Sequence, residues 1–193
     1  SRDYIEDELP AGYERMHNPL EPVYDENSRI LILGSFPSAR SRENGFHYGD
    51  PKNRFWKLLA RLFGEPVPAD TAARKALLLR RGIALWDVVA VCDIKGSSEQ
   101  SIRNVVPADI NRILRAAEIQ TVIANGDTAY RLYQKYCREY TGREAVKCPS
   151  TSPSNAIFTL ERLADRWVEA VEPELWIAGA ENSSQGSIRQ SLE

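Results

Sequence analysis

The stretch Arg29-Ile30-Leu31-Ile32-Leu33-Gly34 decides how this chain folds. A short, unbroken apolar run that ends in glycine is typical of a β-strand buried on both faces of a sheet. On the C-terminal side of this strand, similar runs alternate with segments in which apolar residues recur at helical spacing. We therefore predict strands at 29–33, 83–89, 121–124 and 144–147, and helices at 53–63, 71–81, 107–117, after 127 to about 140, and 157–171.

Strands that alternate with helices predict βαβ units. The expected fold class is α/β, a three-layer α/β/α sandwich with a mainly parallel four-stranded central sheet. In such folds ligands bind at the carboxyl ends of the strands. Here those ends carry Gly34, Asp87, Asn125 and the segment that begins at Cys148. We expect the functional site at this edge of the sheet.

The predicted sheet and its helices form a single domain over residues 29–172. Residues 1–28 are acidic, and their three prolines and one glycine break any regular period, so we expect an irregular segment there. Residues 35–52 and 92–106 are predicted loops. The Gly-, Ser- and Gln-rich tail at 177–193 is expected to be disordered.

The composition is typical of a globular protein: of 193 residues, 42% are hydrophobic and 27% are charged. No run approaches the ~18 apolar residues of a membrane helix, and the start lacks the layout of a signal peptide. The three cysteines, Cys92, Cys137 and Cys148, form no CxxC pair, which predicts free buried thiols in a reducing compartment. His17 and His47 lack metal-ligand spacing. We expect a cytoplasmic monomer that needs no metal or organic cofactor.

The net charge of −2 hides an asymmetry along the chain. Residues 1–27 carry eight acidic and two basic side chains, a net −6, which leaves +4 for the remainder. Residues 40–61 alone carry six basic and two acidic side chains. Such a basic stretch can contact phosphates, although a solvated helix face is the commoner explanation.

The first strand leads into a loop of distinctive sequence. The loop begins Gly34-Ser35-Phe36-Pro37-Ser38, continues through Tyr48 and ends in Pro51-Lys52-Asn53-Arg54-Phe55-Trp56. It is not a nucleotide phosphate loop, because the pattern GxxxxGK[ST] is missing. The last strand runs into a second loop, Pro149-Ser150-Thr151-Ser152-Pro153-Ser154-Asn155. Each loop alone is a weak signal, and their combination is the specific one.

Together these loops resemble the two motifs of the uracil-DNA glycosylase superfamily. The first motif of that superfamily is a strand ending in Gly-x-x-Pro, and the second is a Pro-Ser loop after the last strand. The mismatch-specific branch adds an aromatic residue and Pro-x-Asn-Arg-Phe-Trp, matched here by Tyr48 and residues 51–56. The chain is similar in particular to the hypoxanthine-DNA (deoxyinosine) glycosylase family, which pairs Gly-Ser-Phe-Pro-Ser with Ser-Thr-Ser-Pro and an Asn. The resemblance covers about residues 28–172.

The resemblance implies a monofunctional DNA glycosylase of base excision repair. Such an enzyme flips a damaged deoxynucleotide out of the DNA and hydrolyses its N-glycosidic bond, leaving an abasic site. Deoxyinosine, which releases hypoxanthine, is the expected substrate, with a uracil or mismatch glycosylase of the same superfamily as the alternative. A non-catalytic damaged-DNA-binding module also stays open. A small-ester hydrolase is disfavoured, because G-x-S-x-G is absent and both histidines precede residue 48.

Asn53 and Asp87 are the expected catalytic residues. Several branches of the superfamily place an Asp or Asn before the motif-one proline to position the water, but this chain has Phe36. We assign that role to Asn53, whose amide can orient water although it is no strong base. Asn53 could also be the N-cap of the following helix. Asp87 could stabilise positive charge on the sugar, steer a water, or form a structural pair with Arg103.

Tyr48 is the expected stacking platform for the flipped base. Base–aromatic stacking is worth ~1–3 kcal/mol. Phe46 or Phe36 could share this contact, although aromatic residues in loops often cover a core instead. Asn125 could read the edge of the base, although Asn-Gly is also a common turn.

Backbone groups and loop side chains complete the expected site. Gly34 lets a ligand approach the backbone closely, so that the amides of Ser35 and Phe36 can stabilise the departing base as an anion. The second loop and the polar stretch 96–103 are expected to contact phosphates, although a plain Ser/Pro turn has the same composition. The expected DNA-binding residues are Pro37, Ser38, Lys52, Ser150, Thr151, Ser152, Ser154 and Asn155.

Overall fold

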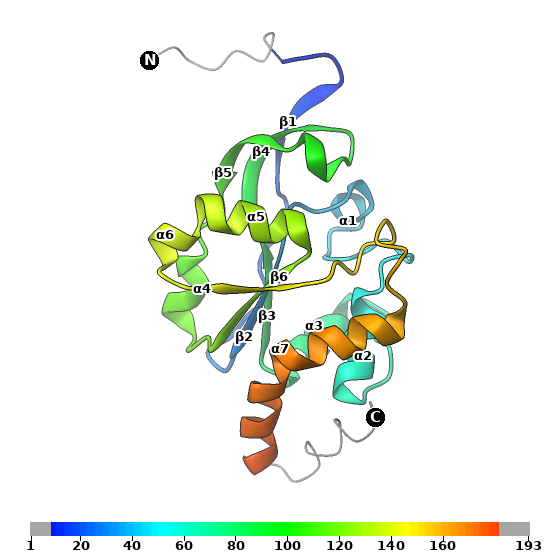
Figure 1. The fold of residues 1–193 in the computed structure, drawn as a ribbon, viewed down its shortest axis with the longest axis vertical. Coiled ribbons are helices and arrows are strands. Elements are labelled where there is room, and N and C mark those ends of the chain that lie inside the picture. Colours follow the sequence, from blue (N-terminus) through cyan, green and yellow to red (C-terminus); the bar gives the residue numbers. More distant parts are fainter. Residues whose placement is uncertain (1–8, 182–193) are drawn as a thin grey trace.

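A computed structural model describes residues 9–181 of the protein (Figure 1). Its centre is a four-stranded parallel sheet with the strand order β3-β2-β6-β7. These strands are β2 (Ile30–Gly34), β3 (Ile83–Asp87), β6 (Thr121–Asn125) and β7 (Ala145–Cys148). The four strands predicted for the central sheet are therefore confirmed.

The side chains of β2 alternate between two apolar cores, one on each face of the sheet. Ile30 and Ile32 belong to one core, and Leu31 and Leu33 belong to the other. The first core lies under α2 (Phe55–Phe63), α3 (Thr71–Arg80) and α7 (Leu160–Glu181), and the second lies under α4 (Asn111–Ala116) and α5 (Asp127–Tyr136). Because both faces are covered, β2 contains no polar side chain. The predicted three-layer α/β/α sandwich is confirmed.

A second sheet, three-stranded and antiparallel, was not predicted. Its order is β1-β4-β5, with β1 (Tyr13–His17), β4 (Val89–Lys95) and β5 (Arg103–Pro107). We predicted an irregular segment over 1–28 and a polar loop over 92–106. Both predictions are wrong where β1, β4 and β5 lie. The buried Asp93 accepts hydrogen bonds from Arg15 at 3.0 Å and from Asn104 at 2.6 Å, so a charge that suggested a loop lies inside the sheet. Residues 1–8 lie outside the described residues.

Two short helices lie in segments that were predicted as loops. α1 (Ala39–Asn44) follows β2, and the hydroxyl of Ser38 caps it by accepting a hydrogen bond from the amide of Ser41 at 3.2 Å. A 3₁₀ turn, η2 (Glu99–Ser101), connects β4 with β5. Both elements border the candidate site described below.

The predicted helices are present with shifted ends. α4 begins later than predicted because Pro107 is still part of β5. The helix expected to reach residue 140 divides at Cys137 into α5 and α6 (Arg138–Thr141). α7 continues to Glu181, past the predicted end and into the tail expected to be disordered, whereas residues 182–193 lie outside the described residues. No helix within residues 9–181 is long and apolar enough to cross a membrane.

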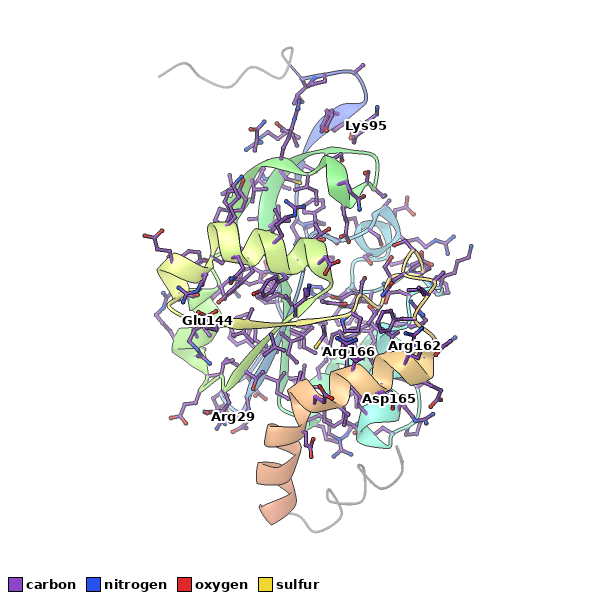
Figure 2. All side chains as sticks on the ribbon, viewed as in Figure 1. Arg29, Lys95, Glu144, Arg162, Asp165 and Arg166 are labelled. Atoms are coloured by element: carbon purple, nitrogen blue, oxygen red, sulfur yellow. The ribbon has the colours of Figure 1, made fainter. Side chains whose placement is uncertain are left out.

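The strand order places a crevice next to β2. Because β3 pairs with one edge of β2 and β6 with the other, the chain connections diverge at the carboxyl ends of these strands. Such a switch point is where parallel α/β sheets bind ligands. Gly34, Asp87 and Asn125 end the three strands there. Charged side chains such as Lys95 and Glu144 lie at the periphery instead (Figure 2).

Candidate active site

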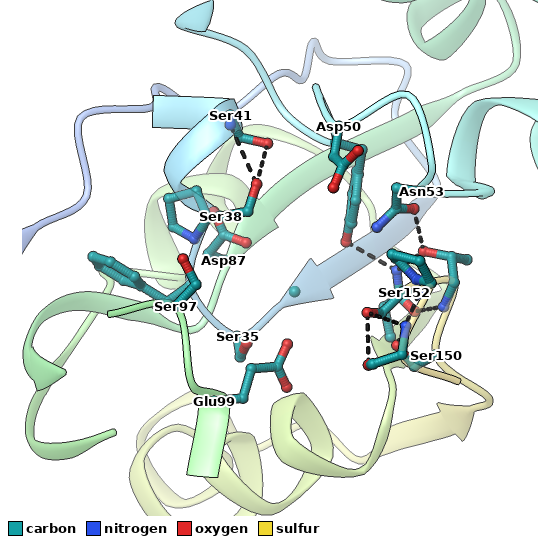
Figure 3. Close-up of a pocket in the computed structure, with 18 of the residues that line it drawn as sticks. Ser35, Ser38, Ser41, Asp50, Asn53, Asp87, Ser97, Glu99, Ser150 and Ser152 are labelled. Carbon is teal, nitrogen blue, oxygen red and sulfur yellow. Dashed lines mark hydrogen bonds between the residues drawn. The ribbon is translucent and has the colours of Figure 1, made fainter. Parts of the chain in front are cut away.

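A cleft of about 360 Å³ opens at the carboxyl ends of β2, β3 and β6. Figure 3 shows Asn53 and Ser152 on one side of it and Asp87 and Ser38 on the other. The predicted site residues that line the cleft are Gly34, Ser35, Phe36, Pro37, Ser38, Tyr48, Asn53, Asp87, Asn125, Ser150, Thr151, Ser152 and Ser154. The two sequence motifs therefore meet in one place.

Three of the predicted site residues do not line the cleft. Phe46 is buried in the core, where its ring stacks on Trp56 with centroids 6.0 Å apart, so it supports the loop and does not face the cleft. Lys52 is exposed on the turn before α2. Asn155 donates its amide to the carbonyl oxygen of Ser150 at 3.0 Å and thereby closes the second loop.

Tyr48 lines the cleft in a strained backbone conformation. Its φ of 51° is in the left-handed region, which a bulky residue adopts only where its surroundings hold it. One ring face stacks on Phe55 at 4.0 Å, and the backbone oxygen accepts a hydrogen bond from Trp56 Nε1 at 3.2 Å. Burial raises the pKa of the Tyr48 hydroxyl, as does the charge of Asp87, so this group keeps its proton.

A hydrogen-bonded network joins Tyr48 to the second loop. Asn125 donates from Nδ2 to the Tyr48 hydroxyl at 3.0 Å and to Thr151 Oγ1 at 3.1 Å. Its Oδ1 accepts the backbone amide of Thr151 at 3.1 Å. Both amide hydrogens of Asn125 are therefore in use, and only a lone pair of Oδ1 remains for a ligand.

Asn53 has its carbonyl oxygen occupied, and its amide nitrogen donates to no group of residues 9–181. Asn53 Oδ1 accepts the backbone amide of Phe55 at 3.0 Å and the hydroxyl of Thr151 at 2.8 Å. The backbone amide can only donate, so this orientation of the side chain is fixed. The predicted N-cap role is wrong, because Arg54 is the N-cap of α2 and Asn53 precedes it, although Asn53 still accepts the first amide of the helix. Any contact of Asn53 with a ligand in the cleft uses its two N–H groups.

Asp87 lies at the floor of the cleft, where it is only 5% exposed. Its Oδ2 accepts a hydrogen bond from Asn18 Nδ2 at 3.0 Å and faces His47 Nδ1 at 3.8 Å. Burial raises the pKa of the Asp87 carboxyl, while His47 and the Asn18 hydrogen bond act in the opposite direction. The sequence analysis considered an ion pair between Asp87 and Arg103. That pair is not formed, because the Arg103 guanidinium lies over the ring of Tyr13, 4.3 Å from its centre.

Gly34 separates these two sides of the cleft. A methyl group on Gly34 would lie 2.6 Å from Asp87 Oδ1 and 3.0 Å from the Tyr48 hydroxyl, so no side chain fits there. Among the residues that the structure describes, no acceptor receives the backbone N–H groups of Ser35 and Phe36. These two amides are thus available to an anion, as predicted for this loop.

Arg54 fixes the shape of the second loop. Its guanidinium donates to the backbone oxygens of Ser152 at 2.8 Å, Asn155 at 3.0 Å and Phe158. Inside the loop, Ser150 Oγ accepts the amide of Ser152 at 3.1 Å. The sequence analysis included Arg54 among the basic residues of 40–61 that can contact phosphates. In the structure its guanidinium instead holds the second loop in shape from inside the protein.

Sequence reasoning missed His47 and Asp50, which line the cleft, and Asn18, which holds Asp87. Glu99 lies in the stretch 96–103, which was predicted to contact phosphates, and it brings a carboxylate to the cleft. Asp50 and Glu99 line it, and Figure 3 shows both together with Asn53 and Ser35. Asn18 has no local signal, because it reaches Asp87 only through the folding of the N-terminal segment. His47 stands directly before Tyr48 in the first motif, which is the one signal that could have drawn attention to it. Within residues 9–181 no group of His, Cys, Asp and Glu side chains has metal-binding geometry.

Comparison with known proteins agrees with this geometry. The model of the uracil DNA glycosylase superfamily matches residues 21–175. A protein of Methanosarcina acetivorans named hypoxanthine DNA glycosylase is 34% identical over 143 residues, which cover 72% of this chain and 89% of that protein. A protein of the same name from Methanosarcina barkeri is 36% identical over 154 residues, which cover 77% of this chain and 94% of that protein.

A solved structure extends the agreement to three dimensions. The solution NMR structure of a Methanosarcina acetivorans protein, described as a candidate uracil DNA glycosylase, superposes with a TM-score of 0.65 at 32% identity. The match covers 78% of this chain and 94% of that one. The resemblance inferred from the two motifs is confirmed: this chain belongs to the uracil DNA glycosylase superfamily.

Proposed function

We propose that this protein is a DNA glycosylase that hydrolyses the N-glycosidic bond of a flipped deoxyinosine, releasing hypoxanthine and leaving an abasic site. The observation that carries the proposal is the network in which Tyr48, Asn125, Thr151 and Asn53 are joined along one side of the cleft, opposite Asp87. The names of the two Methanosarcina relatives support hypoxanthine as the released base.

Base recognition uses the groups that the network leaves free. The ring of Tyr48, backed by Phe55, offers a stacking surface worth ~1–3 kcal/mol. The remaining lone pair of Asn125 Oδ1 can accept an N–H group from the base edge. Hypoxanthine and uracil carry a ring N–H at the position concerned, whereas adenine carries a bare nitrogen there, so the contact favours deaminated bases over adenine.

Bond cleavage leaves positive charge on the sugar and negative charge on the base. The free amides of Ser35 and Phe36 stabilise the departing base, in the way that an oxyanion hole stabilises an oxygen. The N–H groups of Asn53 hold the attacking water by its oxygen. The carboxylate of Asp50, in the same turn as Asn53, can accept a proton from that water.

DNA is the partner that this reaction requires. Ser150, Ser152 and Ser154 lie at one mouth of the cleft, on a loop held rigid by Arg54, which suits it to phosphate contact and to the gap left by a flipped base. Lys52 remains the predicted phosphate contact beside the cleft. The three buried free cysteines support a reducing compartment, which agrees with the predicted cytoplasmic location. We also retain the prediction that the protein is a monomer.

Release of free base tests the function directly. Single-stranded and duplex oligonucleotides that contain deoxyinosine, deoxyuridine, deoxyxanthosine or ethenoadenine are incubated with the protein, and the abasic product is cleaved by alkali and counted. We expect the fastest release from deoxyinosine and none from undamaged DNA. Faster release from deoxyuridine would instead indicate a uracil glycosylase, the activity named in the description of the NMR relative. Salt-sensitive binding without release from any substrate would make the protein a damaged-DNA-binding module.

A further inference from the structure

We infer that His47 and Asp87 form a buried acid pair that shares one proton and passes it to the base as the glycosidic bond breaks. Asp87 is the proton donor, and His47 is the positioning residue that holds the proton with it. This inference rests on the proposed glycosylase function and adds His47, to which the sequence analysis assigned no role.

The orientation of the His47 ring follows from its neighbours. Nε2 lies 2.8 Å from the backbone oxygen of Glu21, which can only accept, so Nε2 carries a hydrogen in every charge state. The other ring nitrogen, Nδ1, faces Asp87 Oδ2 at 3.8 Å. If no proton lay between them, a lone pair of His47 would face a carboxylate where the two side chains are only 3% and 7% exposed. The contact is therefore stable when a proton is held on Asp87 beside His47 Nδ1.

The charge of the cleft makes that proton necessary. The ionisable side chains that line the described cleft are Asp50, Asp87, Glu99, Tyr48 and His47, and no Lys or Arg is among them. A base that left as an anion would therefore meet up to three carboxylates. The backbone amides of Ser35 and Phe36 carry only partial charge. A base that takes up a proton while it leaves avoids this repulsion.

The proton is placed next to the expected seat of the base. Asp87 Oδ1 lies 2.6 Å from the point where a methyl group on Gly34 would stand, directly beneath the loop that carries the two free amides. Oδ2 is held by Asn18, whereas Oδ1 receives no hydrogen bond from the described residues. At rest the proton lies on the Oδ2 side, beside His47 Nδ1, and it enters the cleft from Oδ1 after it has moved between the two oxygens by way of a water molecule.

The reaction balances with water as the sole co-substrate. The bond between the sugar carbon and the base nitrogen breaks, and its electron pair stays with the base. The Asp87 proton moves to a ring nitrogen of the base, while a water oxygen bonds to the sugar carbon and gives up a proton to Asp50 or solvent. A solvent proton then reloads the acid pair. Hypoxanthine has further ring nitrogens with lone pairs that can take this proton, and uracil has none, so acid assistance favours a purine.

The test is the pH profile of hypoxanthine release under single-turnover conditions, with enzyme in excess over a deoxyinosine duplex. The wild-type rate should fall on the alkaline side, as the acid pair loses its proton. Asp87→Asn, which keeps the size and the Asn18 contact, should be slower by about 10²–10³-fold and should lose this alkaline limb. His47→Gln should retain part of the rate and shift the limb to higher pH, because His47 lowers the pKa of the Asp87 carboxyl.

Two further measurements separate the acid pair from other roles. If Asp87 acted as an anion that stabilises the sugar cation, the wild-type rate would show no alkaline limb, which would overturn the inference; a fall on the acidic side follows from Asp50 in either case. Asp87→Asn should also slow hypoxanthine release more than uracil release where both are measurable, and equal losses would overturn it too. Affinity for a duplex with an uncleavable deoxyinosine analogue should change less than about threefold in each variant, and Glu99→Gln, across the cleft, should keep the alkaline limb. A wild-type protein that releases no hypoxanthine contradicts the proposed function instead, before these variants are compared.

Discussion

The two sides of the cleft are built on different chemistry. One side, which we call the neutral wall, consists of Tyr48, Asn53, Asn125 and Thr151, joined by hydrogen bonds of 2.8–3.1 Å. On the other side the two members of the acid pair are 3.8 Å apart, and Asp87 Oδ1 receives no hydrogen bond from the described residues. The neutral wall is tied together by its own hydrogen bonds and leaves the Asn53 N–H groups and one Asn125 lone pair for a ligand, whereas Asp87 offers a carboxyl oxygen.

This difference divides positioning from proton transfer. Amides and a hydroxyl that are already hydrogen-bonded keep one geometry across the physiological pH range, but they have no proton to give. A buried carboxyl beside an imidazole can give a proton, but its state depends on pH. Substitutions in the neutral wall should therefore lower the rate at every pH, whereas those in the acid pair should change the shape of the pH profile.

The largest effect is expected at Asn53. Asn53→Ala removes the N–H groups that hold the water, and should lower the single-turnover rate of base release by about 10²–10³-fold at every pH. The affinity for an uncleavable duplex should change less than about threefold, which is close to the precision of a binding titration. Asn53→Asp keeps an oxygen for Phe55 and Thr151 but has no N–H, so it should be about as slow. A wild-type rate in Asn53→Asp would contradict the donor role, and equal losses of rate and affinity would reduce Asn53 to a structural residue that joins α2 to Thr151.

The next effect is expected at Gly34, where the two sides meet. In Gly34→Ala the methyl group would collide with Asp87 Oδ1 and press on the Tyr48 hydroxyl. A displacement of such groups by about 1 Å can lower the rate on the order of 10²-fold. We expect kcat/KM to fall by about 10–100-fold. Gly142→Ala is a matched control, because Gly142 has a φ of 68° with open space around it, far from the cleft. That variant should lose about 1 kcal/mol of stability and keep its activity.

A smaller effect is expected at Arg54, which holds the loop of the neutral wall from behind. Arg54→Lys cannot span three carbonyl oxygens with one ammonium group, so the loop of 150–155 should loosen. We expect KM to rise about three- to tenfold with a smaller change in kcat, and the free energy of unfolding to fall by about 1–3 kcal/mol. Arg61→Lys is the control, since Arg61 only pairs with the exposed Glu161. A fall in kcat alone would contradict a role in holding the loop.

The central sheet could be predicted from sequence because each of its strands is marked by the residues of a single short segment. Ile30–Leu33 is buried on both faces and therefore reads as an unbroken apolar run. The second sheet depends on distant partners: Asp93 is acceptable inside it only because Arg15 and Asn104 reach it there. The pairing of β4 with β5 also shifts register twice, which breaks the alternation that would have signalled strands.

The same contrast explains which site residues were found. Tyr48, Asn53 and Thr151 lie in motifs of contiguous sequence, so a family pattern could identify them. Phe46 and Tyr48 are both aromatic and nearly adjacent, and only the left-handed turn at Tyr48 decides that one ring joins the core and the other lines the cleft. Asn18 meets Asp87 through the tertiary fold, and no spacing rule could have connected them.

The smallest effect concerns stability and is expected at the acid pair. Burial raises the folded-state pKa of Asp87 above its unfolded value of about 3.9, so the folded protein binds this proton more tightly than the unfolded chain. The free energy of unfolding therefore falls as pH rises from about 4 through the raised pKa. Asp87→Asn has no proton to lose and carries no buried charge, so its Tm should exceed that of the wild type at pH 8 and match it near pH 3.5. Glu99→Gln, an exposed control, should show no such difference. A lower Tm for Asp87→Asn at pH 8 would mean that the ionised carboxylate stabilises the fold, and then Asp87 could not be the resting proton donor of the cleft.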